Sequence, residues 1–176
     1  MNPVQECDID LARHWLELAR QDDVSDRLEA IYAMIADQVD ARRPVCTTSG
    51  RCCNFESYGH RLYVTGLEAA WCTLRLGKAN QDLSTQSVED ALARGGCPFQ
   101  AGLLCGAHEI KPVGCRTYYC DTTAQEWQEA LTERAHGMVR ALHASVGATY
   151  RYMEWRAMLG LMALALEGDG VSPAQR

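Results

Sequence analysis

The chain has 176 residues, of which 47% are hydrophobic, and we expect one domain over residues 1–176 with a single core. Its formal net charge of −6 argues against long-range attraction to nucleic acid or to an anionic membrane. Residues 1–45 hold ten acidic residues and five arginines, which we interpret as a solvated helix face.

Residues 1–10 show no basic start, no apolar core and no cleavage site, so the sequence predicts no export signal. The longest apolar run, Met158 to Leu166, is far shorter than the ~20 residues that a membrane-spanning helix needs. We therefore expect a cytoplasmic protein without membrane insertion. In that reducing compartment cysteines hold metal more often than they form disulfides.

Helical periodicity dominates the N-terminal quarter of the chain. Apolar residues recur at helical spacing over residues 9–18 and again over 24–39, which predicts two N-terminal helices within residues 8–43. Residues 45–60 contain serine, asparagine and glycine together with three cysteines, so we predict a loop there.

The middle of the chain is predicted to alternate short elements with irregular backbone. Residues 61–64 are expected to be extended and to lead into Thr65-Gly66-Leu67-Glu68, a capping box that opens a helix through about Leu76. Ser87 is predicted to begin a short helix that ends at glycines 95 and 96. Residues 96–121 lack a sustained period and contain two prolines and four glycines, which predicts irregular backbone organised by its ligands.

The C-terminal part is predicted to be helical. Thr123-Ala124-Gln125-Glu126 is read as a second capping box, and an apolar stripe follows from Trp127 to Val146. A last helix is predicted from Ala148 to about Leu166, buried in the core, with Trp155 as a packing aromatic. The predicted fold is mainly α: N-terminal helices 8–43 and C-terminal helices 123–167 form a small scaffold. This scaffold carries two irregular cysteine-rich loops within a core of about residues 45–121.

Seven of the nine cysteines gather in two clusters. The first cluster is Cys46, Cys52 and Cys53, and the second is Cys97, Cys105, Cys115 and Cys120. This density of thiols predicts that all seven bind a metal ion or an iron–sulfur cluster. Cys52 and Cys53 are adjacent and can hardly form an unstrained disulfide, and we expect their side chains to diverge. Cys7 is expected to be a free thiol and Cys72 to pack in the core.

The two clusters together resemble a known family. The upstream segment runs from Cys46 through Ser49 to Cys52-Cys53, and the downstream segment contains Cys97-Pro98-Phe99, Cys105, Lys111-Pro112-Val113-Gly114-Cys115-Arg116 and Cys120. This pattern resembles YkgJ-type cysteine-cluster proteins, which are described as zinc- or iron-chelating domains and often called iron–sulfur proteins. The resemblance implies a bound metal and covers roughly residues 45–121.

The sequence departs from the family pattern at two positions. Ser49 stands where the family has its second upstream cysteine, and Lys111 stands where it usually has arginine. A neutral hydroxyl is a poor ligand for soft metals, so we expect position 49 not to coordinate. Seven thiolates still exceed the four that one zinc ion or one [4Fe–4S] cluster requires.

Several side chains near the cysteines are candidates for supporting roles. The positive charges of Arg51, Lys111 and Arg116 are expected to lower cysteine pKa values and to offset thiolate charge. His108 lies between two cysteines, and we interpret it as a packing residue more readily than a ligand. His60 is interpreted as a surface residue or as a donor to a ligand.

Three functions remain open from the sequence. The leading hypothesis is an iron–sulfur protein that transfers electrons or supports a partner enzyme. The alternative is a zinc-stabilised protein-interaction module without catalysis. A third is an oxidoreductase or metal-handling enzyme with an open coordination position, assisted by Asp121 or Glu109. The sequence contains no phosphate-binding, zinc-protease or nucleophile-elbow motif, so it identifies no catalytic residue.

Overall fold

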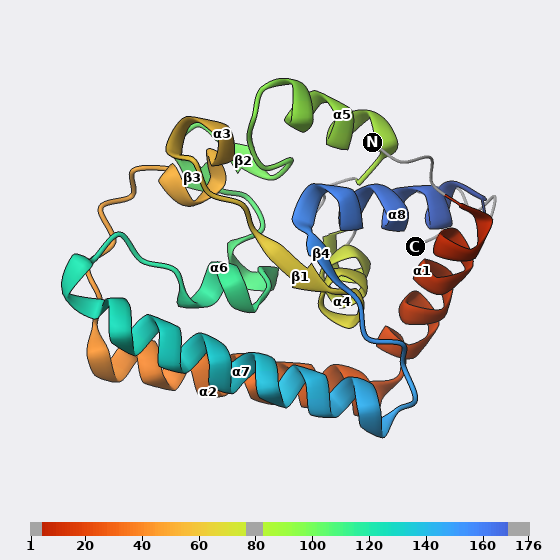
Figure 1. Cartoon of the computed structure of the whole chain (residues 1–176), viewed down its shortest axis with the longest axis horizontal. Helices are drawn as coiled ribbons and strands as arrows, with labels where there is room; N and C mark the ends of the chain where they lie inside the picture. The colour runs from red at the N-terminus through yellow and green to blue at the C-terminus, as the bar shows by residue number, and fades with distance from the viewer. Residues whose placement is uncertain (1–4, 77–82, 169–176) are drawn as a thin grey trace.

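The structure, a computed structural model, describes residues 5–76 and 83–168 and confirms the mainly helical fold (Figure 1). The α-helices are α1 (Glu6–Ala19), α2 (Asp22–Arg42), α3 (Phe55–Tyr58), α4 (Gly66–Leu76), α5 (Thr85–Ala93), α6 (Val113–Thr117), α7 (Gln125–Ser145) and α8 (Trp155–Gly168). The strands are β1 (Tyr63–Thr65), β2 (Gln100–Ala101), β3 (Leu104–Cys105) and β4 (Tyr152–Glu154), and the 3-10 turns are η1 (Arg51–Cys53), η3 (His108–Ile110) and η4 (Thr122–Ala124).

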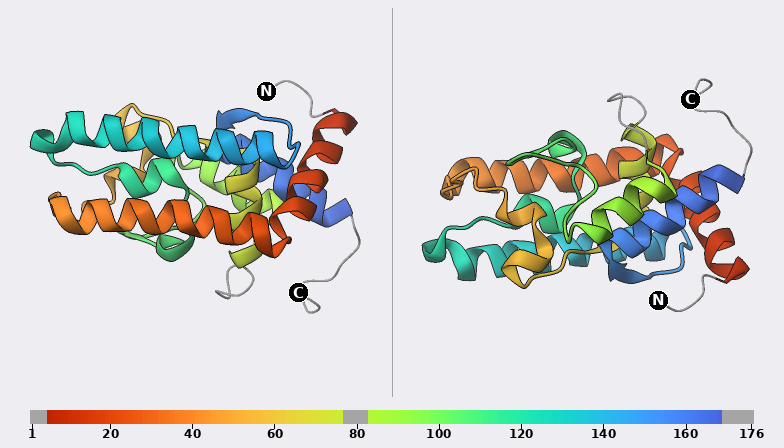
Figure 2. Two further views of the ribbon diagram at one scale, coloured as in Figure 1. Left: turned by 90° about the horizontal axis from the view of Figure 1, so that it is seen from below. Right: turned by 90° about the horizontal axis from the view of Figure 1, so that it is seen from above.

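The helices form two groups. The long helices α2 and α7 run antiparallel and side by side along one edge of the molecule (Figures 1 and 2). Helix α1 packs on α4 and α8 at the other end, and α5 covers α8. Helix α6 lies between the two groups, in contact with α2 and α7. The part of the second cysteine segment that forms α6 therefore packs against the helical scaffold.

The core is centred on Trp15 of α1, which is fully buried. A Cβ atom at Gly66 would lie 2.2 Å from the Trp15 ring, so only glycine allows the start of α4 to approach the indole this closely. The indole N–H of Trp15 also donates to the carbonyl of Thr149 at 3.0 Å. One aromatic side chain thus holds α4 and the segment before β4 against α1.

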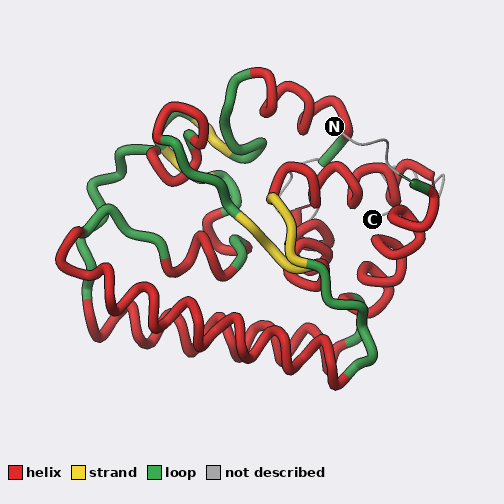
Figure 3. The backbone as a smooth tube through the Cα atoms, in the orientation of Figure 1, coloured by secondary structure: helices red, strands yellow, loops and turns green. Residues whose placement is uncertain are grey.

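The predicted start of the last helix is wrong. We expected a helix from Ala148, but α8 begins at Trp155 and is preceded by β4, which pairs antiparallel with β1. Figure 3 shows these two strands lying together across the helices. The run Thr149-Tyr150-Arg151-Tyr152 is rich in residues that favour strands, and the pairing partner supplied by β1 decides the outcome.

The two predicted capping boxes have different outcomes. The carboxylate of Glu68 accepts hydrogen bonds from the Thr65 N–H at 3.1 Å and the Thr65 hydroxyl at 2.8 Å, so one of the two reciprocal bonds of the first capping box is present. The second is wrong, because α7 begins at Gln125 without a side-chain cap. Instead the Asp121 carboxylate accepts from the Thr123 N–H at 2.9 Å and caps η4.

The two cysteine segments are largely irregular, as predicted, but each contains short elements. Residues 45–60 include η1 and α3, and residues 96–121 include the β2–β3 hairpin, η3 and α6. The short predicted helix begins at Thr85 rather than Ser87, because Ser84 accepts the Ser87 N–H as its cap. In the described ranges, every helix is too short or too polar to cross a lipid bilayer.

The buried His143 near the end of α7 generates a pH prediction. Burial is the main cause that lowers its pKa to about 4, from 6.5. As the pH falls from 6.5 to 4, the unfolded chain takes up a proton at this position and the folded chain does not. The folded state should therefore lose up to about 3 kcal/mol over that range. We expect His143→Leu to abolish this loss in urea unfolding between pH 7 and pH 4.5.

The exposed His14 provides the control for this prediction. His14→Leu should keep the pH dependence of the original chain, since this side chain is exposed and lies outside the core. Equal slopes of unfolding free energy against pH for both variants would contradict the assignment to His143.

Candidate metal centre

The backbone brings the first cysteine cluster against the start of the second. The N–H of Cys97 donates to the carbonyl of Cys53 at 2.8 Å, and the N–H of Glu56 donates to the carbonyl of Gly95 at 3.0 Å. A Cβ atom at Gly96 would stand 3.2 Å from the Cys53 carbonyl oxygen, so the missing side chain permits this approach. These contacts bring the two cysteine segments together at Cys53 and Cys97.

Five of the seven predicted ligands line one small cavity of about 10 Å³. They are Cys52, Cys53, Cys97, Cys105 and Cys115, and Phe55, Phe99, Ala107, Lys111, Pro112 and Trp155 complete the lining. This volume is about that of one water-sized sphere. The centre of the candidate site is therefore a small cavity shared by five thiols and bordered mainly by apolar side chains.

Cys53 is the middle of this thiol group. Its thiol interacts with those of Cys105, Cys52 and Cys97, and the Cys52 and Cys53 sulfur atoms lie 4.0 Å apart. The expectation that these two side chains diverge is wrong. In a 3-10 turn such as η1, successive side chains point a third of a turn apart, whereas in a strand they point to opposite sides.

The thiol group has strongly divided proton affinities. Contact with Cys53 is the largest cause that lowers the pKa of Cys52 and of Cys105, each to about 6. Contact with Cys105 is in turn the largest cause that raises the pKa of Cys53. The Cys53 thiol therefore stays protonated and donates toward the sulfur atoms of Cys52 and Cys105, which lose their protons more readily. A metal cation can replace such a proton, since it also neutralises thiolate charge.

The surroundings of the group suit anionic sulfur. Contact with Cys53 is the largest cause that lowers the pKa of Cys97, and the backbone N–H of Phe99 and the indole of Trp155 lower it further. The backbone N–H of Ala107 does the same for Cys105. As predicted, the charge of Lys111 lowers the pKa of both Cys52 and Cys105, although less than their contact with Cys53 does. Donors and positive charge that face sulfur stabilise thiolates.

The donor chemistry therefore fits a soft metal, but the ligand set is not closed. Within residues 5–76 and 83–168, no three Cys, His, Asp or Glu side chains are already placed to bind one ion together. The sulfur atoms would have to turn toward a common centre. The backbone contacts fix the Cα positions of Cys53 and Cys97. Coordination of one ion would require rotation of the cysteine side chains.

The other two predicted ligands lie apart from the cavity. The Cys120 sulfur is 3.8 Å from the Ser49 hydroxyl oxygen, and Cys46 is exposed. A serine hydroxyl is a poor ligand for soft metals, so Ser49 offers Cys120 no partner for binding such an ion. Binding of metal by Cys46 and Cys120 stays a prediction. Cys72 is fully buried in α4, as expected, and Cys7 is exposed.

Helix α6 carries Cys115. The helix is held in place by Glu68, for which the sequence predicted only a capping role at the start of α4. The Glu68 carboxylate, whose other oxygen caps α4, accepts the Val113 N–H at 2.9 Å. A Cβ atom at Gly114 would lie 2.6 Å from the Leu62 side chain, so α6 packs closely on the chain before β1. An acidic residue in an otherwise buried helix was the available signal in the sequence.

Two arginines hold the backbone around the thiols. Arg116 lies 4.1 Å above the Tyr32 ring and donates to the carbonyls of Lys111 and Glu109 at 2.6 and 2.7 Å. Arg156 is 1% exposed and pairs with Glu56 at 3.1 Å, which ties α8 to α3. Arg116 thus braces the segment that carries Lys111 instead of mainly adjusting thiol pKa values.

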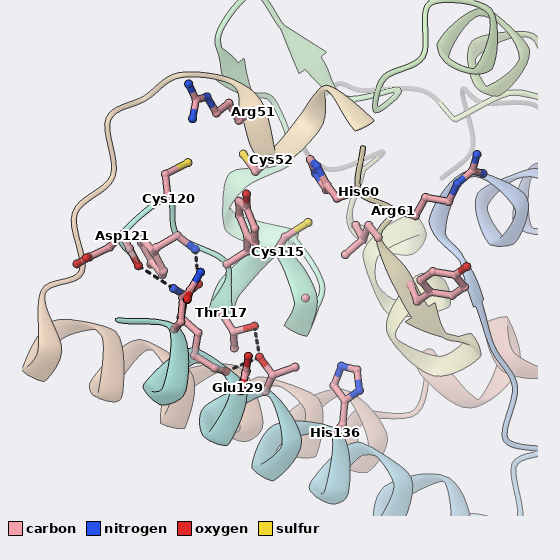
Figure 4. A pocket seen from close by; sticks show the side chains of 18 of the residues that line it. Arg51, Cys52, His60, Arg61, Cys115, Thr117, Cys120, Asp121, Glu129 and His136 are labelled. Atoms are coloured by element: carbon pink, nitrogen blue, oxygen red, sulfur yellow. Dashed lines mark hydrogen bonds between the residues drawn. The ribbon is translucent and has the colours of Figure 1, made fainter. Parts of the chain in front are cut away.

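A groove of about 760 Å³ runs beside the cavity, between α7 and the chain that carries His60 and β1. Cys52 and Cys115 line both the groove and the cavity. In Figure 4 their sulfur atoms lie at one end of the groove, and Glu129 and His136 lie farther along α7. The thiol group is therefore adjacent to a surface from which a second molecule can approach it.

The two histidines near the cysteines differ in their positions: His60 lines the groove, and His108 lies outside it. His60 lines the groove and stacks on Tyr118 with ring centroids 5.6 Å apart, while Phe55 meets its edge. His108 is exposed and contacts Lys111 at 3.0 Å, outside both the groove and the cavity, so its expected packing role is wrong. The short η3 turn directs this side chain to solvent.

Comparison with known proteins yields no matching family model, no similar curated protein and no similar solved structure.

The hydrogen bonds of Glu68 generate a stability prediction. Glu68→Ala leaves the Thr65 and Val113 N–H groups buried without an acceptor, and we expect a loss of about 3 kcal/mol or more in unfolding free energy. Urea denaturation measures this loss. The control is Glu17→Ala on the exposed face of α1, which should change stability by less than about 0.5 kcal/mol. Equal effects of both substitutions would show that Glu68 does not join α4 to α6.

Proposed function

We propose that this protein binds a metal through the thiol group of Cys52, Cys53, Cys97 and Cys105. The observation that carries the proposal is the position of Cys53, which contacts three other thiols from two distant parts of the sequence. Four thiolates are a common ligand set of structural zinc sites and of iron–sulfur clusters in proteins. A bound ion would neutralise the sulfur charge and hold the two cysteine segments together.

The spacing of the sulfur atoms supports a single ion. A tetrahedral ion with metal–sulfur bonds of ~2.3 Å separates its ligands by ~3.8 Å, and the Cys52 and Cys53 sulfur atoms are 4.0 Å apart. The small cavity volume agrees with an occupant of one ion. We therefore favour a zinc-type centre over an iron–sulfur cluster. In this proposal the metal organises the loops, and the helical scaffold offers a surface for protein interaction.

The iron–sulfur alternative keeps one specific observation in its favour. Cys115 adds a fifth thiol to the cavity, and together with Cys52 it also faces the groove. A centre that is reached from the surface suits exchange of electrons with a redox partner. An iron–sulfur cluster would supply one-electron chemistry and visible absorption, whereas zinc would supply neither.

Metal analysis of anaerobically purified protein tests the proposal. We expect a stoichiometric metal in the original chain and its loss in Cys53→Ala, because that substitution removes the central thiol. Cys72→Ala removes an equally small buried thiol outside the site, so it should keep the metal and cost roughly 1 kcal/mol. Metal retained by Cys53→Ala, or lost by Cys72→Ala alone, would refute the assignment. A colourless zinc protein and a brown iron protein distinguish the two candidates.

Removal of the metal should loosen the cysteine segments more than the helices. Residues 96–121 have little regular structure of their own, whereas α7 and α8 contribute buried apolar residues to the core. Hydrogen exchange before and after chelation should therefore show faster exchange in residues 96–121 than in residues 127–166. Uniform loss of protection across both ranges would contradict this expectation.

A further inference from the structure

Trp155, the first residue of α8, has an indole N–H whose role is not explained by packing. The side chain is 1% exposed and lines the thiol cavity. Its Nε1 atom is buried and has no hydrogen-bond partner of ordinary geometry among the described residues. A buried donor without an acceptor is unfavourable, so its retention in a tight core requires a reason.

The indole shares the small cavity with the thiol of Cys97, and it is one of the groups that lower the pKa of that thiol. A neutral thiol is a weak acceptor, whereas a metal-bound thiolate carries the negative charge that attracts an N–H donor. The donor is therefore poorly satisfied by the thiol form of Cys97 and well satisfied by the thiolate form. This difference links Trp155 to the metal-bound state rather than to the empty site.

The position of the indole is fixed independently of any metal. The Trp155 backbone N–H donates to the Leu62 carbonyl at 2.8 Å, which anchors the start of α8 to the chain before β1. The indole meets the Phe99 ring at a centroid distance of 6.0 Å and an interplanar angle of 66°. The donor is thus held in place before a ligand arrives, and little ordering is required to form the bond.

We propose that the Trp155 indole N–H donates a hydrogen bond to the Cys97 sulfur when the thiol group holds a metal ion. This inference rests on the proposed function and gives Trp155 the role of a positioning residue. The bond fixes the orientation of the Cys97 side chain toward the ion. It also reduces electron donation from this sulfur to the metal, as outer hydrogen bonds to ligands do.

Trp71 offers a matched control within the same chain. It is also buried, and its Nε1 atom also lacks a partner among the described residues. However, Trp71 packs against Tyr32 and lies under Arg75, and it does not line the thiol cavity. Replacement of either tryptophan by phenylalanine removes one buried N–H and a similar volume, but only Trp155→Phe removes a donor from the thiol cavity.

Cadmium-113 bound in place of the native metal tests the proposal by NMR. In the original chain we expect the ¹¹³Cd signal in the region of sulfur ligands, with a coupling across the hydrogen bond to one indole N–H proton. That proton should vanish in Trp155→Phe and persist in Trp71→Phe. We also expect Trp155→Phe to lower cadmium affinity roughly tenfold or more, with little change in Trp71→Phe.

The outcomes separate the two levels of inference. Thiolate-bound cadmium without a coupled indole proton, together with equal affinities in both variants, would overturn the role of Trp155 and leave the metal site intact. Absence of thiolate-bound cadmium in the original chain would overturn both proposals. Should Trp155→Phe fail to fold, the coupling in the original chain decides the question alone.

Discussion

The buried carboxylate of Glu68 is the constraint that joins the helical scaffold to the cysteine segments. It is 1% exposed and accepts hydrogen bonds from the Thr65 N–H, the Thr65 hydroxyl and the Val113 N–H. A buried carboxylate is costly unless such donors satisfy it, so these partners cannot be exchanged for water without a penalty. Because Glu68 binds the Thr65 N–H at the start of α4 and the Val113 N–H at the start of α6, it fixes the position of α6 and of Cys115.

The thiol group combines a fixed backbone with adjustable side chains. Backbone hydrogen bonds set Cys97 against Cys53, and glycine at position 96 makes the approach possible. The sulfur atoms themselves lie close together without a shared centre for an ion. For the proposed metal, the backbone is already in place, so the remaining ordering cost of binding is limited to side-chain rotation.

The location of the group between the core and the groove gives its sulfur atoms different environments. Cys53 and Cys97 are each 5% exposed, whereas Cys52 is exposed. Trp155 and Phe99 close the inner side, and the groove along α7 opens the outer side. This asymmetry allows one part of the centre to stay dry while another part faces a partner molecule.

The sequence by itself determined the helices with strong apolar periodicity, the hydrogen bond from the Thr65 N–H to Glu68 and the two cysteine segments, because these features depend on neighbours within a few residues. The strand β4 was missed, since its structure depends on pairing with β1 about 90 residues away. The density of cysteines in two short segments also marked them as candidate metal ligands. Only the tertiary structure decided that Cys53 stands at the middle of the group while Cys46 and Cys120 lie apart, and that Glu68 and Trp155 belong to its surroundings. Those relations arise from contacts between segments distant in the chain, and local patterns alone do not specify them.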